Sequence, residues 1–260
     1  MARCAARYAA GIDCGSSFCK GALIRDDGPG SPVLIAKLLS APTGWNIGET
    51  GGSLRDGLLA GLSGEAVLSA TGYGRDRIPG RDRTISEISA HARGAAFLRP
   101  GLRTLIDIGG QDCKVLALEG GRVLDFQMND KCAAGSGRFL ESVCRILRVE
   151  GDLLEELLGR GKSVALNSTC VVFAESEIIG LLARGLSREE ILGGVADSLA
   201  RRIAALAARV SPAEPAALSG GLASSAGIAG ALSWALGIAV EPLEQGAFAG
   251  ALGAALACLD

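Results

Sequence analysis

Two stretches of the sequence, "GIDCGSSFCKGALI" at 11–24 and "LIDIGGQDCKVLAL" at 105–118, repeat each other and decide the fold. Five residues are identical between them, and every pair has the spacing of Asp13 and Asp107, which is 94 positions (107 − 13 = 94). A constant spacing over several identities indicates a duplicated unit. In both copies aliphatic runs flank a glycine turn, which predicts two strands joined by a tight turn.

Each copy continues from strands into helical patterns. The first copy predicts strands at 7–13, 18–25, 31–39 and 66–70 and helices at 46–62 and 84–98. The second predicts strands at 103–108, 113–118, 122–127, 163–166 and 215–219 and helices at 136–149, 152–159, 174–184, 188–209, 223–236 and 246–258. Strands followed by helices, twice over, predict two α/β domains with a cleft between them.

Pro and Gly in "LRPGL" (98–102) interrupt the helical pattern between the two copies, which is typical of a boundary. We therefore expect one domain at 1–98 and a second at 99–260. The last helix, 246–258, is expected to be able to pack back onto the first domain.

The composition excludes several classes of protein. Hydrophobic residues make up 48% of the 260 positions and aromatic residues 4%, so the core is built from Ala, Leu, Ile and Val. The net charge of −2 argues against a nucleic-acid partner. The first residues lack the apolar segment of a secretory signal, and no apolar run reaches the roughly 18 residues of a membrane span. We expect a soluble, cytoplasmic protein.

The turn of the first copy suits the phosphates of a nucleotide. Backbone N–H groups of Gly15, Ser16 and Ser17 could surround an anion, and Lys20 adds positive charge. Asp13, at the end of the preceding strand, is the candidate to hold Mg²⁺ through water, because this ion prefers oxygen ligands and keeps its waters.

The second copy offers Asp107, Gly109, Gly110 and Gln111 at the corresponding positions. A single turn of this kind is weak support, since hairpins use such turns constantly. Two copies in order favour a pair of turns that hold the β- and γ-phosphates, with Asp13, Asp107 and Gln111 as the catalytic candidates.

A third glycine pair, Gly220 and Gly221 in "ALSGGLASS" (217–225), follows a predicted strand and precedes a predicted helix. Glycine lets a flat ring or a sugar approach the backbone, so this pair is the candidate adenosine site. Gln245, where the chain enters the last helix, is a further candidate contact to the nucleotide.

The order of two phosphate turns and one adenosine glycine pair resembles the acetate kinase, sugar kinase, Hsp70 and actin superfamily. Within it, "GYGR" (72–75), "NDKCAAGSGRFLE" (129–141) and "STCVVFAESE" (168–177) resemble the BadF/BadG/BcrA/BcrD-type ATPases that activate 2-hydroxyacyl-CoA dehydratases. The resemblance covers essentially the whole chain and implies duplicated ribonuclease-H-like domains. "CGSS" and the serines ending "SGGLASS" depart from the usual family pattern, and the second leaves the adenosine contacts open.

The eight cysteines form no C-x-x-C pair, and the expected reducing compartment argues against a disulfide scaffold. Cys132 and Cys170 both lie in loops that open helices, where the helix dipole favours a thiolate or an anionic cluster. Spacing alone leaves open that they are two unrelated buried cysteines. Cys144 lies on a buried helical stripe, and Cys19 and Cys113 are interpreted as core packing.

The family resemblance implies what the thiols bind. In a homodimer, Cys132 and Cys170 of both chains would hold one bridging [4Fe–4S] cluster. The protein would bind ATP or ADP with Mg²⁺ and accept an electron from reduced ferredoxin or flavodoxin. It would pass the electron to a 2-hydroxyacyl-CoA dehydratase, itself an iron–sulfur enzyme.

Two alternatives remain open. One is the ATPase subunit of a benzoyl-CoA-reductase-type complex, and the other is a cluster-free sugar or acyl kinase of the same fold. His91, the one histidine, lies one turn after Glu87, which predicts an i,i+4 contact and argues against a general base.

Overall fold

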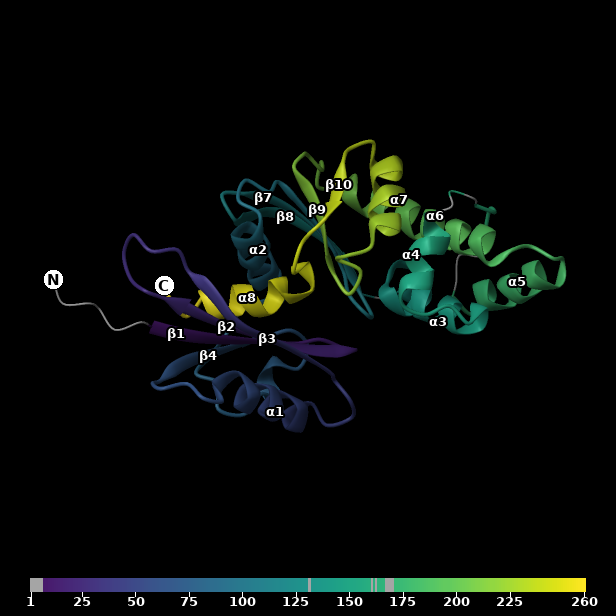
Figure 1. Cartoon of the computed structure of the whole chain (residues 1–260). Coiled ribbons are helices and arrows are strands. Elements are labelled where there is room, and N and C mark those ends of the chain that lie inside the picture. The colour runs from purple at the N-terminus through teal and green to yellow at the C-terminus, as the bar shows by residue number, and fades with distance from the viewer. Residues whose placement is uncertain (1–6, 131, 160, 162, 167–170) are drawn as a thin grey trace. The chain divides into compact units, whose positions relative to one another are not determined.

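The computed structural model describes residues 7–130, 132–159, 161, 163–166 and 171–260 (Figure 1). These residues form two compact units, which we describe separately. Unit 1 comprises the described part of Met1–Gly101 together with Gly120–Val123 and Ala247–Asp260. Unit 2 comprises the described part of Leu102–Glu119 and Leu124–Gly246.

Unit 1 is a five-stranded mixed sheet with helices on both faces. Its elements are β1 (Arg7–Cys14), β2 (Phe18–Asp26), β3 (Leu34–Pro42), α1 (Ile47–Leu59), β4 (Ala66–Thr71), the 3₁₀ turn η1 (Arg75–Arg77), β5 (Arg83–Thr84), α2 (Glu87–Leu98) and α8 (Ala249–Leu256). The strand order is β3-β2-β1-β4-β5. β1 is antiparallel to β2 and parallel to β4, so the sheet begins as a hairpin and continues through a helical crossover.

The alternation of side chains along β1 places two helices on opposite faces of this sheet. Ile12 packs with Leu58 of α1, whereas Ala9 packs with Leu252 of α8. Residues an odd number of positions apart on a strand point to opposite faces. α1 and α8 therefore cover the two faces of the sheet (Figure 1). Asp13 lies near the carboxyl end of β1, the central strand.

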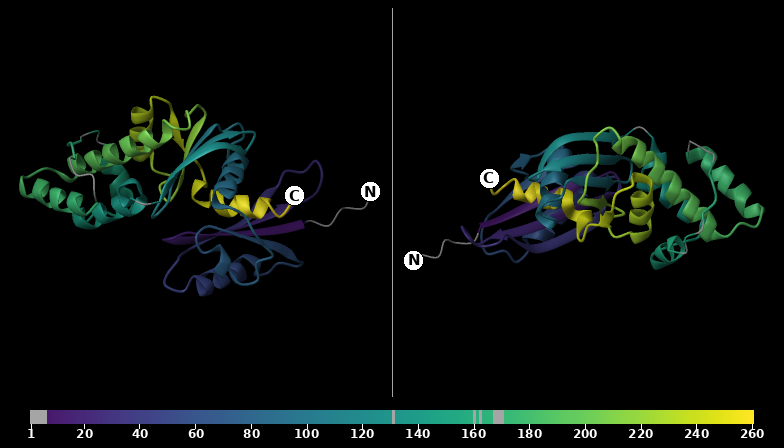
Figure 2. Two further views of the ribbon diagram at one scale, coloured as in Figure 1. Left: turned by 180° about the vertical axis from the view of Figure 1, so that it is seen from behind. Right: turned by 90° about the horizontal axis from the view of Figure 1, so that it is seen from above.

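α2 and α8 lie side by side in both orientations of the molecule (Figure 2). A Cβ atom on Gly94 of α2 would overlap the carbonyl oxygen of Ala249, and one on Gly253 of α8 would overlap that of Ala90. Glycine at both crossing points lets the two backbones touch. The position of each helix is consequently fixed by the other.

Unit 2 repeats the sheet of unit 1. Its elements are β6 (Thr104–Ile108), β7 (Cys113–Glu119), β8 (Arg122–Asn129), η2 (Ala133–Gly135), α3 (Gly137–Leu147), α4 (Asp152–Leu158), α5 (Val171–Ala183), α6 (Arg188–Ala207), β9 (Ala216–Gly220), α7 (Ala226–Leu236) and β10 (Val240–Pro242), followed by the turn η3 (Gly246–Phe248). The order β10-β9-β6-β7-β8 is that of the first sheet read from its other edge. The predicted duplication of an α/β fold is confirmed.

The registers of the two hairpins also agree. Asp13 lies opposite Lys20 in the β1–β2 pair, and Asp107 lies opposite Lys114 in the β6–β7 pair. The spacing of 94 positions in the sequence therefore corresponds to equivalent places in the two sheets. Among the described residues, no helix is both long and apolar enough to cross a membrane.

Two predicted strands need correction, and two short strands are additional. The strand predicted at 163–166 is wrong, because these residues have no strand conformation and lie against α6. Val164 donates its N–H to the carbonyl of Glu190 at 3.0 Å, and its own carbonyl occupies the space of a Cβ on Gly194. The third strand is shifted to Leu34–Pro42, and the short strands β5 and β10 were not predicted.

Candidate functional site

The turn between β1 and β2 is held in shape by its own backbone and by Thr43. Gly15 donates its N–H to the carbonyl of Phe18 at 3.1 Å. Thr43 donates its N–H to the carbonyl of Ser17 at 2.9 Å and its hydroxyl to the carbonyl of Gly15 at 2.7 Å. Of the three N–H groups predicted to surround an anion, that of Gly15 is therefore already used. Those of Ser16 and Ser17 donate no hydrogen bond within the described part of the chain.

Asp13 stands behind this turn in a space shaped by two glycines. Its carboxyl group is 5% exposed, and among the described residues its Oδ1 atom has no hydrogen-bond partner. A Cβ on Gly72 would lie 2.5 Å from this oxygen, and one on Gly250 would overlap Oδ2. Gly74 donates its N–H to the carbonyl of Cys14 at 3.0 Å, so the "GYGR" motif is attached to the same strand end. A buried carboxylate oxygen without a partner is a place for a ligand.

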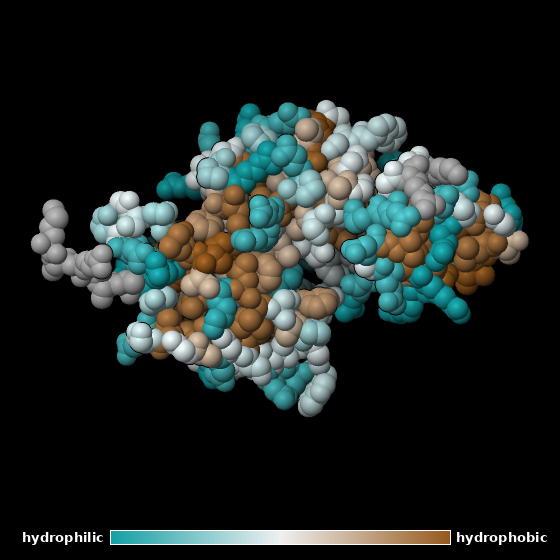
Figure 3. All heavy atoms as spheres, in the orientation of Figure 1, coloured by the Kyte–Doolittle hydropathy of each residue, from teal (hydrophilic) through white to brown (hydrophobic). Residues whose placement is uncertain are grey.

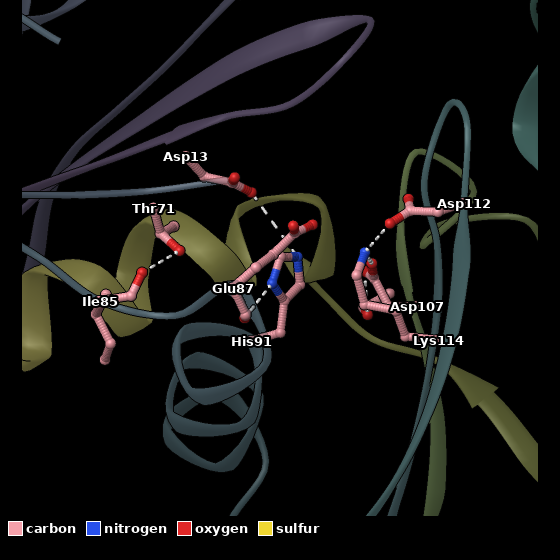
Figure 4. Close-up of polar contacts among 9 residues, drawn as sticks. Asp13, Thr71, Ile85, Glu87, His91, Asp107, Asp112 and Lys114 are labelled. Atoms are coloured by element: carbon pink, nitrogen blue, oxygen red, sulfur yellow. Dashed lines mark hydrogen bonds and ion pairs between the residues drawn. The ribbon is translucent and has the colours of Figure 1, made fainter. Parts of the chain in front are cut away.

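His91 of α2 lies against the same carboxylate (Figure 4). Its Nε2 atom is 3.7 Å from Oδ2 of Asp13, and its Nδ1 atom is 2.9 Å from the carbonyl oxygen of Glu87. The predicted contact between His91 and Glu87 is thus present, made to the backbone. Lys20, the predicted cation of this site, is half-buried and forms no ion pair within the described residues.

In unit 2 the equivalent aspartate is fully satisfied (Figure 4). Ser219 of β9 donates its hydroxyl to Oδ1 of Asp107 at 2.7 Å, and Nζ of Lys114 is 3.4 Å from Oδ2. The same Nζ atom is 2.8 Å from a carboxylate oxygen of Asp112. Lys114 is 1% exposed, and a buried ammonium group is tolerated because it is paired.

The turn between β6 and β7 is tied to the start of α3. Gly109 donates its N–H to the carbonyl of Asp112 at 2.9 Å. The carbonyls of Gly109 and Gly110 accept hydrogen bonds from the N–H groups of Gly137 at 2.8 Å and Arg138 at 3.0 Å. These are the first two residues of α3, so the helix that follows the first cysteine loop is fixed to the turn. Gln111 is exposed at the tip.

The third glycine pair lies beside the same turn. Gly221 donates its N–H to the carbonyl of Ile108 at 3.0 Å, and a Cβ on Gly220 would overlap that carbonyl. Gly220 also has φ +85°, a conformation that only glycine adopts freely. Unit 2 therefore brings the predicted adenosine pair next to the predicted phosphate turn. Gln245 is exposed, with φ +55°.

The loop of Cys132 is shaped by Asn129. Oδ1 of Asn129 accepts a hydrogen bond from the N–H of Cys132 at 3.1 Å, and Nδ2 donates to its carbonyl at 3.0 Å. The Cys132 thiol is free and exposed. Cys170 lies outside the described residues. Within the described ranges no three His, Cys, Asp or Glu side chains gather as a metal site.

Among the remaining cysteines, Cys4 lies outside the described residues. The others are one pair, the buried Cys113, and the half-buried Cys144 and Cys258. Cys14 and Cys19 are opposite each other in the hairpin register and are joined as a disulfide, which corrects the interpretation of Cys19 as simple core packing. Burial raises the pKa of Cys113 to about 12 and that of Cys144 to about 11. Burial likewise raises the pKa of Cys258 to about 11.

Sequence reasoning did not select five residues that shape the two sites: His91, Gly250, Asp112, Lys114 and Ser219. The sequence repeat could have identified Lys114, because it corresponds to Lys20 in the other copy. Ser219 precedes the glycine pair directly. His91 and Gly250 had no sequence signal, because they reach Asp13 only through the packing of α2 and α8.

Both units present a buried strand-end aspartate beside a glycine turn, on sheets of one topology. This combination defines a two-unit ATPase of the actin and Hsp70 type. Residues 10–258 match the model of the BadF/BadG/BcrA/BcrD ATPase family, and the chain belongs to this family.

Relatives agree with this assignment. The chain is 41% identical over 257 residues to the (R)-2-hydroxyglutaryl-CoA dehydratase activating ATPase of Acidaminococcus fermentans, covering 96% of each chain. The crystal structure of component A of that dehydratase superposes with a TM-score of 0.87 at 39% identity, over 96% of this chain and 97% of the other. The 2-hydroxyisocaproyl-CoA dehydratase activator from Clostridium difficile with bound ADPNP gives 0.85 at 37% identity, over 96% and 93%.

Proposed function

We propose that this ATPase activates a 2-hydroxyacyl-CoA dehydratase by ATP-dependent electron transfer in the cytoplasm. The names of the relatives, which activate such dehydratases, support this partner. In the proposal two copies form a homodimer with one bridging [4Fe–4S] cluster. The electron donor is reduced ferredoxin or flavodoxin, and the acceptor is the iron–sulfur dehydratase. The proposed domains are 1–98, joined by the last helix, and 99–260.

The residues of unit 1 fit a magnesium nucleotide. Oδ1 of Asp13 is a buried oxygen without a hydrogen bond, which suits a ligand that supplies water or a metal ion. The free N–H groups of Ser16 and Ser17 suit a phosphate oxygen. Bound Mg²⁺ would stabilise negative charge on the phosphates. Asp13 holds its water shell in the proposal, and Lys20 contributes charge from the neighbouring strand.

The residues of unit 2 fit the remaining nucleotide roles. Gly220 and Gly221 leave room for adenosine, with Gln245 as a further contact, and the turn at Gly109 and Gly110 takes phosphate. Asp107 and Gln111 orient the attacking water in the proposal. Lys114 pairs with the buried Asp107 carboxylate at 3.4 Å and holds it in place.

Cys132 fits a shared cluster by its chemistry. Its thiol is free and exposed, while Asn129 fixes the backbone on both sides of it. A thiolate is the usual ligand of an iron–sulfur cluster, which supplies a one-electron redox centre when bound. Because such a cluster takes four thiolates, the proposal needs Cys170 and a second copy of the chain.

An apolar surface over α5 supports the second copy. Phe173 is 68% exposed and Ile179 is 58% exposed, and Leu182 is also exposed. Figure 3 shows apolar residues gathered over this helix. α5 begins directly after Cys170 in the sequence, so an interface here would lie beside the proposed ligand. Exposed apolar patches of this kind are typical of protein interfaces.

The observation that carries the proposal is the attachment of α3 to the phosphate turn. A change in the turn at Gly109 and Gly110 moves the acceptors of the Gly137 and Arg138 N–H groups. These residues follow Cys132 after one short 3₁₀ turn. Nucleotide binding is therefore linked to the cysteine loop through backbone hydrogen bonds, as an ATP-dependent electron carrier requires.

The proposal is tested by iron and sulfide analysis of anaerobically purified protein together with its mass in solution. We expect four iron and four sulfide per dimer, the content of one [4Fe–4S] cluster. Cys132→Ser and Cys170→Ser should lose both, while Cys144→Ser should retain them because that thiol packs against the core. A colourless protein with sugar- or acyl-dependent ATP consumption would establish the kinase alternative. Co-purification of a second related ATPase chain would establish the benzoyl-CoA-reductase alternative.

A further inference from the structure

His91 has a defined place in unit 1 that the proposed function leaves unused. Its side chain is buried, with 5% of the residue exposed. The two ring nitrogens face different oxygen atoms, the Glu87 carbonyl at 2.9 Å and the Asp13 carboxylate at 3.7 Å (Figure 4). Two contacts at opposite corners of a planar ring fix both its tilt and its rotation.

The surrounding helices leave the ring no other position. A Cβ on Gly250 of α8 would lie 2.8 Å from Cε1 of His91. α2 and α8 touch through Gly94 and Gly253, so the two helices cannot separate by the width of a side chain without losing this packing. The ring is therefore a fixed part of unit 1.

This fixed ring selects the orientation of Asp13. The terminal torsion of an aspartate is broad, so the strand alone does not decide where the two oxygens point. Oδ2 lies between the imidazole of His91 and the small surface of Gly250, whereas Oδ1 lies beside Gly72 without a hydrogen bond. Oδ2 thus lies within ion-pair distance of the imidazole, while Oδ1 is buried and has an unused hydrogen-bonding capacity among the described residues.

We propose that His91 is a positioning residue of the ATPase, which fixes the Asp13 carboxylate so that Oδ1 is available to the magnesium nucleotide. The inference rests on the proposed role of Asp13. It assigns the histidine no proton transfer and no contact with the nucleotide. Its effect on the rate comes from geometry, because displacement of a catalytic group by about 1 Å costs up to a hundredfold.

Three variants separate positioning from packing. His91→Phe keeps a planar ring and removes both nitrogens, and His91→Gln restores a side-chain amide on the same helix. Arg93→Ala is the matched control, because Arg93 lies on α2 at the surface and pairs with Asp260 at 2.6 Å. We expect His91→Phe to lower kcat for ATP hydrolysis about tenfold to a hundredfold with KM changed less than about threefold. His91→Gln should recover part of kcat, and Arg93→Ala should match the wild type.

A second measurement does not depend on turnover. Mn²⁺ is titrated by electron paramagnetic resonance into the protein with a non-hydrolysable ATP analogue. We expect His91→Phe to weaken Mn²⁺ binding about tenfold, by analogy with the loss of one oriented ligand, while affinity for the metal-free analogue is unchanged. The inference is overturned if His91→Phe has the kcat and the Mn²⁺ affinity of the wild type. It is also overturned if this variant shows only a rise in KM.

The design also separates this inference from the proposed function. If Asp13→Ala leaves Mn²⁺ affinity unchanged, the proposed role of Asp13 fails, and the inference fails with it. If Asp13→Ala abolishes Mn²⁺ binding while His91→Phe does not weaken it, only the inference fails. Should the phenylalanine variant not fold, His91→Leu takes its place with the same expected values.

Discussion

The β1–β2 and β6–β7 hairpins occupy equivalent places in two sheets of one topology, yet their aspartates have different polar partners. Asp107 is paired with a lysine from its own hairpin and with Ser219, and both its oxygens are used. Asp13 has a histidine from a distant helix on one side and an oxygen without a partner on the other. The equivalent lysine, Lys20, forms no ion pair with it among the described residues. Duplication has preserved the backbone, and the polar contacts have diverged.

One position accounts for much of this difference. Asp112, which holds Lys114 in the second hairpin, corresponds to Phe18 in the first (112 − 18 = 94). Without a second carboxylate, a buried lysine at position 20 would have one partner fewer. The first hairpin thus leaves its lysine half-buried and available, while the second encloses its lysine. The paired lysine of the second hairpin favours a rigid structure. The lysine of the first hairpin, which lacks the second carboxylate, favours ligand binding.

The largest expected effect comes from removing each aspartate. Asp13→Ala and Asp107→Ala should each lower ATP hydrolysis about a hundredfold or more, as expected for loss of a preorganised charge. Their stabilities should differ, because Asp107→Ala leaves a buried lysine without this partner, at a cost of about 3 kcal/mol. Phosphate release and urea unfolding measure the two effects, with the exposed Asp125→Ala as control. Equal losses in the free energy of unfolding would show that the two aspartates contribute equally to stability, contrary to this expectation.

Asp107→Ala should also keep its iron, because Asp107 is hydrogen-bonded to Ser219 and Lys114 in the neighbouring strands, whereas Cys132 lies in the loop before α3. Iron analysis of the anaerobically purified variant checks this expectation. Loss of iron from a variant that still folds would mean that the phosphate turn and the cysteine loop are one site.

The lysines sharpen the comparison. Lys114→Met should destabilise the protein by about 3–5 kcal/mol, because it leaves the buried Asp107 and the half-buried Asp112 without their cation. Lys20→Met should change stability by less than about 0.5 kcal/mol, as a partly exposed substitution does. It should weaken ATP binding about tenfold, which corresponds to the loss of one hydrogen bond to a charged group, and leave the affinity for adenosine unchanged. Calorimetry with ATP and with adenosine measures the two affinities. Equal weakening of both would place Lys20 outside the phosphate site.

The link from the second hairpin to the cysteine loop predicts a smaller, selective effect. Gly137→Pro removes the N–H that binds the Gly109 carbonyl, and proline is tolerated at the first position of a helix. Gly137→Ala adds the same Cβ atom, 3.0 Å from the Gly109 carbonyl oxygen, and keeps the N–H. We expect the proline variant to retain ATP hydrolysis within about threefold and to lose about tenfold in dehydratase activation, the value of one hydrogen bond. If both variants behave alike, bulk and not the hydrogen bond is responsible.

The smallest effect concerns the thiols at equivalent positions 19 and 113. At pH 8 iodoacetamide should label Cys132 in the folded, cluster-free protein and leave Cys113 unlabelled, because burial raises the pKa of Cys113 to about 12 and keeps it protonated. Cys14 and Cys19 should become labelled only after reduction and unfolding. Peptide mass spectrometry locates the labels. Labelling of Cys19 without a reductant would show that the disulfide is not formed.

The sequence alone predicted the duplicated hairpins, the equivalence of Asp13 and Asp107, and the strand ends at which they lie. Those features are local, and a turn between two aliphatic runs fixes the register of a hairpin. The neighbours of Asp13 could not be predicted, because Gly72, His91 and Gly250 come from three separate segments joined only by packing. The two-residue and three-residue strands β5 and β10 are too short for alternation to be read.

The Cys14–Cys19 pair was within reach of the same reasoning and was missed. A tight turn between strands predicted at 7–13 and 18–25 places residues 14 and 19 opposite each other. We argued against a disulfide scaffold from the expected reducing compartment and did not consider this pairing. The roles of Asp13, Asp107, Gln111, Cys132 and Cys170 stay predictions until the variants above are measured.

Unit 1 is built from both ends of the chain, which has a consequence for biosynthesis. Translation completes all of unit 2 before Ala247–Asp260, so α8 leaves the ribosome only after unit 2 has been made. Until then the sheet face formed by Ala9, Ala22 and Ile24 has no helix to cover it. At typical translation rates this interval lasts on the order of ten seconds. The nascent chain therefore presents an apolar sheet to chaperones while its second half is already able to fold.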